Sequence, residues 1–295
     1  MIEKLSHCSR SALCLVIFVA LGIVHTPVTH AAPSDSDLYF TELQQRLVRD
    51  GFNAEMVNVL YRRPDITFET RSVSLFFIHS EGKLDYDQFS NQWSISRARK
   101  YMQKHTADLE RIEKEFGVDK TVITAIILVE TGLGTVMGKS STLNALSSLA
   151  ALKDPAPREM FWKNFKNKDE LTRKDFNKKA ARKSAWAYRE LKAFLEYTQR
   201  ENLDPQTIYG SYAGAMGIPQ IMPTNIAPYA RDGSQDGAID LFNHADAMAS
   251  IASYLKTFGW KPGITRAKKK EIVHRYNHSS YYVDTILKIS DLLKK

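Results

Sequence analysis

The chain of 295 residues carries 41 lysines and arginines against 33 aspartates and glutamates, a net charge of +8 at neutral pH. That length is ample for one large domain or two small ones, and the basic balance suits an anionic partner. For an exported protein, nucleic acid is an improbable partner, whereas the bacterial cell wall and anionic membrane surfaces are available. Much of the positive charge lies in residues 163–183, which a solvated protein surface explains equally well.

Residues 1–31 have the pattern of a secretory signal peptide. Lys4 and Arg10 precede an apolar run at residues 12–24, and a small-residue stretch ends at Ala31. A membrane-spanning helix is the competing interpretation, but the run is shorter than the roughly 20 residues that cross a bilayer. We therefore expect a periplasmic protein with no stable membrane anchor after cleavage.

Both cysteines, Cys8 and Cys14, lie within the expected signal peptide. Neither ends a small-residue box of the kind that precedes a lipid-modified cysteine. The mature chain, residues 32–295, is therefore expected to have no disulfide and no lipid anchor, so its stability has to come from core packing, with or without a metal.

Apolar residues recur at helical spacing along most of the mature chain. The pattern predicts helices at 38–47, 56–61, 96–116, 118–130, 143–152, 180–198, 245–258, 267–276 and 281–293. Gly117 is expected to end one of these helices and Asp119 to cap the next. Residues 67–94 are less periodic and are expected to be extended or looped. No segment shows sustained strand alternation, so the predicted fold class is mainly α.

Residues 165–180 are rich in lysine, asparagine and aspartate. This composition indicates an inserted segment or hinge, or equally a mobile surface loop.

Glu130 closes the almost wholly apolar residues 118–129 and is followed at once by Thr131-Gly132-Leu133-Gly134. Burial in a core and the negative end of the helix dipole both disfavour a charged carboxylate, so the sequence predicts a raised pKa for Glu130. Such an acid is what the cleavage of a glycosidic bond requires. The alternative is an ordinary glutamate, solvated and structural, at a helix end.

Residues 210–223 combine small residues with a hydroxyl and an amide in one short segment. Gly214 and Gly217 would let the backbone approach another group closely, while Ser211 and Gln220 could hydrogen-bond a polar ligand or the acid itself. A tight helix-packing seam explains the same composition.

Residues 232–240 have the spacing of a calcium-binding loop. Side-chain oxygens stand at positions 1, 3 and 5 (Asp232, Ser234 and Asp236), and the carbonyl of Ala238 stands at position 7. The usual glutamate at position 12 is replaced by Asn243, which favours a merely polar loop.

Taken together, these motifs resemble those of the lytic murein transglycosylases of the MltB type. The matching segments are Val129-Glu130-Thr131, Val136-Met137-Gly138-Lys139, the whole of 210–223, Ser250-Ile251-Ala252-Ser253-Tyr254, Tyr276-Asn277 and Tyr282. The resemblance extends from about residue 37 to about residue 292. It implies a lysozyme-like catalytic core with additional helical segments and an EF-hand-like loop, so that residues 32–295 form one catalytic domain.

The resemblance also implies the chemistry. Glu130 would be the lone catalytic acid and base, acting on the bond between N-acetylmuramic acid and N-acetylglucosamine in peptidoglycan and leaving 1,6-anhydro ends. The saccharide cleft would be lined by Ser211, Gln220, Tyr254, Tyr276, Asn277 and Tyr282. The tyrosines would offer flat surfaces to sugar rings, although plain core packing explains buried tyrosines equally well.

Members of this family carry a loop whose last carboxylate comes three residues late, and Asp246 stands at that place. The resemblance thus implies one structural calcium on Asp232, Ser234, Asp236, Ala238 and Asp246, no organic cofactor, and a monomer acting on glycan strands. One departure is the single Arg158 where members can carry paired arginines. The alternatives are a hydrolytic muramidase, a non-catalytic wall-binding protein and a calcium-regulated scaffold.

Overall fold

The structure is a computed structural model that describes residues 36–78, 86–165 and 171–295. The expected signal peptide lies outside these residues. Helices form most of the described chain, so the prediction of a mainly α fold is confirmed. Among the described residues, no helix combines the length and the apolar character needed to cross a membrane.

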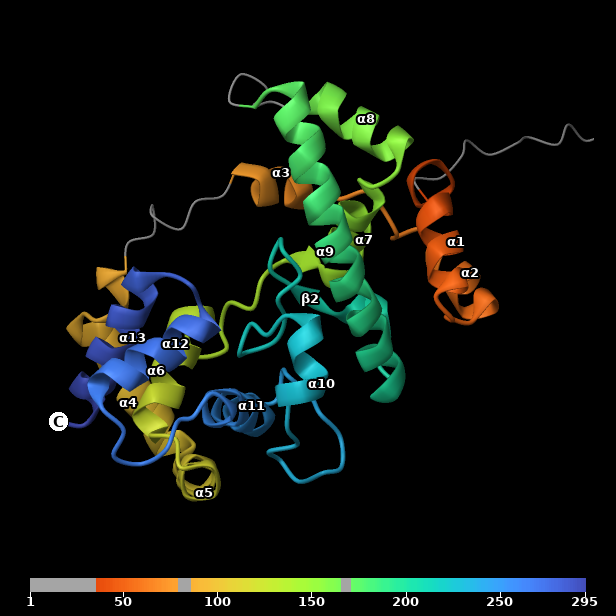
Figure 1. The fold of residues 1–295 in the computed structure, drawn as a ribbon. Helices are drawn as coiled ribbons and strands as arrows, with labels where there is room; N and C mark the ends of the chain where they lie inside the picture. Colours follow the sequence, from red (N-terminus) through yellow and green to blue (C-terminus); the bar gives the residue numbers. More distant parts are fainter. Residues whose placement is uncertain (1–35, 79–85, 166–170) are drawn as a thin grey trace, which may run out of the picture. The chain divides into compact units, whose positions relative to one another are not determined.

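One hydrophobic cluster joins helices from the N-terminal part of the chain to helices from its middle. Its helices are α1 (Thr41–Arg49), α2 (Ala54–Tyr61), α3 (Thr70–Ile78), α7 (Thr142–Ala151), α8 (Pro155–Asn164) and α9 (Arg173–Arg200). A short π-helical turn, Ser36–Phe40, precedes α1. Every residue of α7 is buried, because this helix packs along α9 and also contacts α1 and α3 (Figure 1).

A second hydrophobic cluster surrounds α6 (Lys120–Thr131). Its other helices are α4 (Gln92–Lys104), α5 (Thr106–Phe116), α11 (His244–Thr257), α12 (Arg266–Tyr276) and α13 (Ser280–Leu293). α6 packs against α13 and also contacts α4, α5 and α11. Residues close to the C-terminus therefore contact the helix that carries Glu130.

A two-stranded antiparallel pairing connects the chain after α6 to the glycine-rich residues 210–223. β1 (Ser140–Ser141) pairs with β2 (Tyr209–Gly210), with Ser140 opposite Gly210. The remaining short helices are η3 (Asp87–Phe89), η5 (Pro205–Thr207), η6 (Pro223–Asn225) and α10 (Ile226–Tyr229).

Three predicted elements differ from those observed. The helix expected at 96–116 is divided at His105, whose φ of −111° and ψ of 27° leave the helical region. Residues 70–78, expected to be looped, form α3. The helix expected from residue 180 begins at Arg173, because the Thr172 side chain accepts a hydrogen bond from the backbone N–H of Asp175.

The early start of α9 also changes the interpretation of residues 165–180. Residues 173–180 are its first turns, with Phe176 and Ala180 buried, so this part is not a mobile loop. Residues 166–170 lie outside the described chain, and the predicted insertion is untested there. Asp119 makes no side-chain capping bond to α6, contrary to expectation, and pairs instead with Lys269 at 2.6 Å.

Candidate active site

The helix that carries Glu130 is buried along almost its whole length. Residues 121–128 of α6 are all buried, which confirms that this helix lies inside a core rather than on one. Glu130 itself, in the last turn, is half-buried. The Glu130 carboxyl therefore lies at the boundary between the core and the surface.

The glycine turn after Glu130 ends α6 with a left-handed residue. Gly132 has φ 58° and ψ 38°, a conformation that side chains with a Cβ rarely adopt. Its N–H donates to the carbonyl of Leu128 at 3.0 Å, and the N–H of Leu133 donates to the carbonyl of Ile127 at 3.2 Å. These bonds satisfy carbonyls at the helix end and fix the direction in which the chain leaves Glu130.

Tyr282 holds the carboxylate of Glu130. Its hydroxyl donates to Glu130 Oε1 at 2.7 Å from α13, and its ring is only 1% exposed. Burial, followed by the negative charge of Glu130, raises the pKa of Tyr282 well above its ordinary value of 10.0. The tyrosine is therefore protonated at neutral pH and acts as a hydrogen-bond donor.

Tyr276 lies beside this pair and connects it to the glycine-rich segment. Its hydroxyl donates to the carbonyl of Pro219 at 2.6 Å. Burial and then the charge of Glu130 raise the pKa of Tyr276 well above its ordinary value of 10.0. Thr131, next to Glu130, donates through Oγ1 to the carbonyl of Ile218, the residue before Pro219. The end of α12, the end of α6 and residues 210–223 thus meet at one point.

The tyrosines do not all have the role expected from the sequence. Tyr254 is 7% exposed, packs edge-on against Tyr276 with ring centres 5.0 Å apart, and donates to the carbonyl of Arg275. Tyr254 and Tyr282 therefore present almost no ring surface, which favours core packing over the expected sugar platforms at these two positions. The alternative interpretation, core packing, agrees with the burial of both rings.

Several contacts hold residues 210–223 against the turn after Glu130. Thr131 Oγ1 donates to the carbonyl of Ile218 at 3.0 Å, and Gln220 Nε2 donates to the carbonyl of Met137 at 3.2 Å. A Cβ on Gly138 would lie 1.9 Å from the carbonyl oxygen of Gly210, so the two backbones touch there.

The glycines expected to face a ligand pack against protein instead. A Cβ on Gly214 would meet the Leu146 side chain at 2.6 Å, and one on Gly217 would meet the carbonyl oxygen of Leu241 at 2.5 Å. Both glycines are buried. At these two positions the packing-seam interpretation is right.

Ser211 and Asn277 hydrogen-bond the backbone of their own loops. Ser211 Oγ accepts from the N–H groups of Ala213 and Ala215, and Asn277 Oδ1 accepts from the N–H of Ser279. Both side chains are half-buried, so they reach the surface. Their contact with a saccharide stays a prediction.

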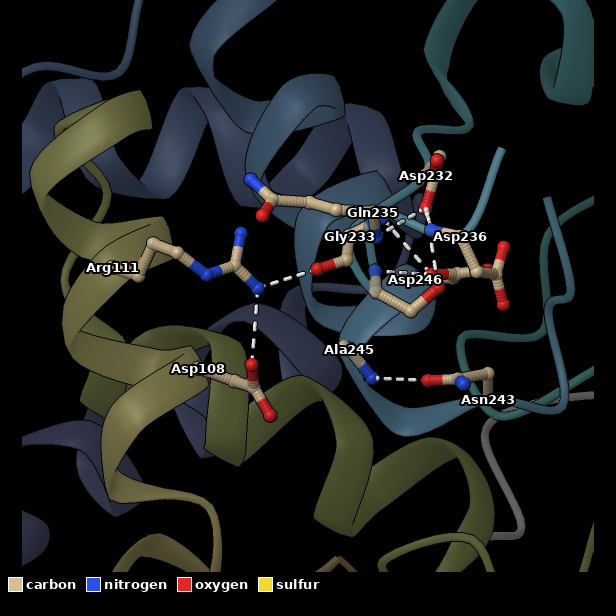
Figure 2. Close-up of polar contacts among 10 residues, drawn as sticks. Asp108, Arg111, Asp232, Gly233, Gln235, Asp236, Asn243, Ala245 and Asp246 are labelled. Atoms are coloured by element: carbon tan, nitrogen blue, oxygen red, sulfur yellow. Dashed lines mark hydrogen bonds and ion pairs between the residues drawn. The ribbon is translucent and has the colours of Figure 1, made fainter. Parts of the chain in front are cut away.

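Residues 232–240, called here the acidic loop, are held closed by carboxylates that accept backbone N–H groups (Figure 2). Asp246 is fully buried and accepts from Gly233 at 2.9 Å, Ser234 at 2.8 Å and Asp240 at 2.7 Å. Asp232 accepts from the N–H of Gly237, the main cause of its lowered pKa. Asn243, at position 12, caps α11 by accepting from the N–H of Ala245.

The loop is also attached to α5. Arg111 bonds Asp108 at 3.0 Å and reaches across to the carbonyl oxygen of Gly233, as Figure 2 shows. The atoms of the acidic loop that could bind a metal are hard oxygens, the type that calcium prefers. Among them, Ser234 Oγ lies 3.1 Å from Asp232 Oδ1. In the described chain, no three acidic, histidine or cysteine residues are grouped closely enough to hold a metal. The ligand types fit calcium, while the observed geometry is that of a loop closed by hydrogen bonds.

Comparison with known proteins decides the family. The model of the transglycosylase SLT domain matches residues 35–271. The chain belongs to this family. The membership confirms the resemblance to MltB-type enzymes that the motifs indicated.

Among curated proteins, this SLT domain is similar to the membrane-bound lytic murein transglycosylase B of Escherichia coli K12. The two are 36% identical over 155 residues, which is 52% of this chain and 36% of the relative. The aligned stretch thus spans little more than a third of that relative's length.

Two solved structures show the same fold. The soluble lytic transglycosylase SltB1 of Pseudomonas aeruginosa is 25% identical, with a TM-score of 0.70 over 85% of this chain and 97% of the other. The E. coli lytic transglycosylase Slt35, solved in complex with calcium, is 21% identical, with a TM-score of 0.66 over 86% and 91%. The predicted lysozyme-like fold is therefore confirmed.

Sequence reasoning missed two supports of the SLT domain's glycine turn. Arg97 Nη2 donates to the carbonyl of Gly132 at 2.8 Å. His244, bonded through Nδ1 to the Tyr101 hydroxyl at 2.9 Å, lies so close to Gly134 that a Cβ there would be 2.9 Å from its ring. Neither contact has a local sequence pattern, because each joins segments that are far apart in the chain.

Proposed function

We propose that this chain is a lytic transglycosylase that cleaves the β-1,4 bond between N-acetylmuramic acid and N-acetylglucosamine in peptidoglycan. The observation that carries the proposal is the half-buried Glu130 at the glycine-capped end of α6, bonded to Tyr282 at 2.7 Å. Membership of the transglycosylase SLT family and the likeness to a murein transglycosylase support the choice of substrate.

Glu130 acts first as the acid. It gives its proton to the oxygen that joins the two sugars, and the bond to the muramyl C1 breaks with oxocarbenium or acetamido-stabilised character. The Tyr282 hydroxyl then donates to the carboxylate that remains. Because burial fixes the Tyr282 hydroxyl in place, this hydrogen bond orients Glu130 in both proton-transfer steps.

Glu130 acts next as the base. Its carboxylate takes the proton from the 6-hydroxyl of the same muramyl residue, whose oxygen bonds to C1. The product is a 1,6-anhydro end, and no water is consumed. Ordinary glycosidases need a second carboxylate as nucleophile or to activate water. An internal hydroxyl takes the place of that water, so one carboxyl fills both roles.

Product analysis tests this proposal. Purified peptidoglycan digested with the mature protein should yield fragments with 1,6-anhydromuramyl ends, visible by mass spectrometry as the loss of one water relative to hydrolysis products. Reducing ends in place of anhydro ends would contradict the proposal and identify a muramidase. A protein that binds the wall and releases no fragment would be a non-catalytic binder.

The acidic loop is proposed to hold one structural calcium on Asp232, Ser234, Asp236, the carbonyl of Ala238 and Asp246. The donor set and the calcium complex of Slt35 support this assignment. An ion that binds only the folded state should raise the melting temperature, by about 5–10 °C when calcium is well above its Kd. Chelation should reverse the rise.

Asp236→Asn is the matched variant for the calcium test. Asp236 Oδ1 accepts the N–H of Ala238, and asparagine can keep that bond while losing the charge. The variant should melt like the chelated wild type and should not respond to calcium. Identical melting temperatures of the wild type with calcium and with chelator would contradict the proposed calcium site.

The protein is proposed to act in the periplasm, as a monomer on glycan strands. The expected signal peptide and the location of the proposed substrate support this placement. A net positive charge suits a wall whose peptide stems carry carboxylates.

A further inference from the structure

An exposed tryptophan lies next to the end of α6 and has no role in the site described above. Trp93, in the first turn of α4, is 67% exposed, although large aromatic rings are usually well buried. The guanidinium of Arg97, one helical turn later, lies 4.6 Å from the centre of the Trp93 ring. Because Arg97 covers one part of the Trp93 ring, the exposed area is the remaining part of this ring.

The same arginine is fixed to the catalytic turn. Arg97 Nη2 donates to the carbonyl of Gly132 at 2.8 Å, which uses one of the five N–H donors of a guanidinium. The tryptophan, the arginine and the glycine turn therefore form one continuous surface.

That surface is concave. A pocket of about 310 Å³ is lined by Gln88, Trp93, Arg97, Leu128 and Gly132, together with neighbouring residues of α4 and η3. Leu128 lies in the last turns of α6, and Gly132 is the residue that caps the end of this helix. Glu130 is two residues from each in the chain, but its side chain leaves α6 on the side opposite Leu128. The pocket is therefore close to the proposed acid along the chain and does not contain it.

The lining has the chemistry that recognises an anionic sugar. A flat aromatic face packs against the C–H groups of a sugar ring, and a guanidinium binds a carboxylate through paired N–H donors. Peptidoglycan offers both on one unit, because each muramyl residue carries a peptide stem with carboxylates.

We propose that Trp93 and Arg97 form an accessory site for a muramyl unit of the strand. The sugar ring packs on the open face of Trp93, and a carboxylate of its peptide stem binds Arg97. This inference rests on the proposed function. It adds a site outside the set that the sequence motifs indicated.

The test measures binding in the Glu130→Gln background, so that turnover does not destroy the ligand. The probe is a soluble disaccharide-peptide fragment of peptidoglycan, titrated by calorimetry. Trp93→Leu, which keeps an apolar side chain but removes the ring, should weaken binding by about tenfold. Trp93→Phe should recover most of the loss. Both variants should melt like their parent, because the side chain is exposed.

Two further arms separate the ring from the charge. Arg97→Gln should weaken binding of the disaccharide-peptide while changing the weaker binding of a neutral chitin oligosaccharide much less. Trp93→Leu should weaken both ligands. Val59→Ala, at another exposed apolar residue (63%), is the control and should change neither.

The inference is overturned if Trp93→Leu binds the disaccharide-peptide as tightly as its parent. Such a result leaves the proposed function intact, provided that the wild-type protein still releases anhydro ends from peptidoglycan. If the Glu130→Gln protein binds no fragment and the wild type releases none, the proposed function fails and this inference fails with it.

Discussion

The Glu130 carboxylate and the Tyr282 hydroxyl are 152 positions apart in the chain and 2.7 Å apart in space. Because Tyr282 is buried, its hydroxyl cannot exchange this bond for one to water without opening the core. The orientation of the proposed acid is therefore fixed by the packing of α13 against α6. On this account Tyr282 is a positioning residue, and Glu130 alone exchanges a proton with the substrate.

Tyr282→Phe tests the positioning role. The ring remains in place while the bond to Glu130 is lost, and hydrogen bonds to charged groups contribute about 1.5–3 kcal/mol. We expect kcat for peptidoglycan cleavage to fall roughly 10- to 100-fold, with little change in KM.

Tyr61→Phe is the control for that variant. Tyr61 is also buried, and its hydroxyl lies 2.7 Å from Ser147 Oγ in the other hydrophobic cluster. It should lose stability comparable to that lost by Tyr282→Phe and keep its kcat. Equal kcat values for the two variants would show that Tyr282 matters only for folding.

Glu190 makes the protein's stability depend on pH. This buried carboxyl accepts from the N–H and the Oγ1 of Thr224, and burial raises its pKa above the ordinary value of 4.5. A raised pKa in the folded state means that stability present at low pH is lost as pH rises through that pKa. Glu190→Gln removes the charge and should escape this loss.

Urea unfolding at about pH 4 and about pH 7 measures the effect. The free energy of unfolding of the wild type, relative to Glu190→Gln, should be lower at the higher pH. Glu196→Gln, at an exposed glutamate of the same helix, is the control and should show no such change. A difference that is constant with pH, or that changes in the opposite direction, would contradict the burial of an ionised Glu190.

At the scale of elements, the chain after α6 packs closely against residues 210–223. Gly138 has a φ of 97°, and a Cβ there would lie 1.9 Å from the carbonyl oxygen of Gly210. Gly138→Ala should therefore force the two segments apart. We expect a large loss of peptidoglycan cleavage and a clear drop in melting temperature.

Gly51→Ala is the matched control. Gly51 has a similar φ of 101°, but no atom of the described residues lies within 4 Å of its Cβ position. Gly51→Ala should lower the free energy of unfolding only by the backbone strain, about 1 kcal/mol or slightly more, and should leave kcat unchanged. If Gly138→Ala is no more harmful than Gly51→Ala, the contact between the two segments is not needed.

The elements of this fold were predictable where a local pattern encodes them. The apolar run and the glycine after Glu130 correctly gave α6 and its end, and the periodic C-terminal helices were found within one or two residues. The break at His105 was missed because the apolar spacing continues across it. α3 was missed because residues 70–78 pack in a cluster that the local sequence does not reveal.

At the scale of the whole molecule, the motifs predicted the family and the fold, while the contacts between segments came only from the structure. The sequence placed Tyr254, Tyr276 and Tyr282 together as site residues. It could not show that Tyr254 and Tyr282 are buried, because the same tyrosine serves as a surface ring or as a core donor. Likewise, the acidic spacing predicted a metal loop but not its closure by the N–H bonds to Asp246.

Proton transfer by Glu130 is the central step of the proposed reaction, and Glu130→Gln tests it most directly. Glutamine keeps the shape and can still accept from Tyr282, but it cannot supply a proton. The measurement is the release of anhydromuramyl fragments, together with binding to insoluble peptidoglycan, with Glu115→Gln at an exposed glutamate as control. We predict a loss of release of roughly a hundredfold to ten-thousandfold with binding preserved, and no change in the control. Release at the wild-type rate by Glu130→Gln would contradict the account.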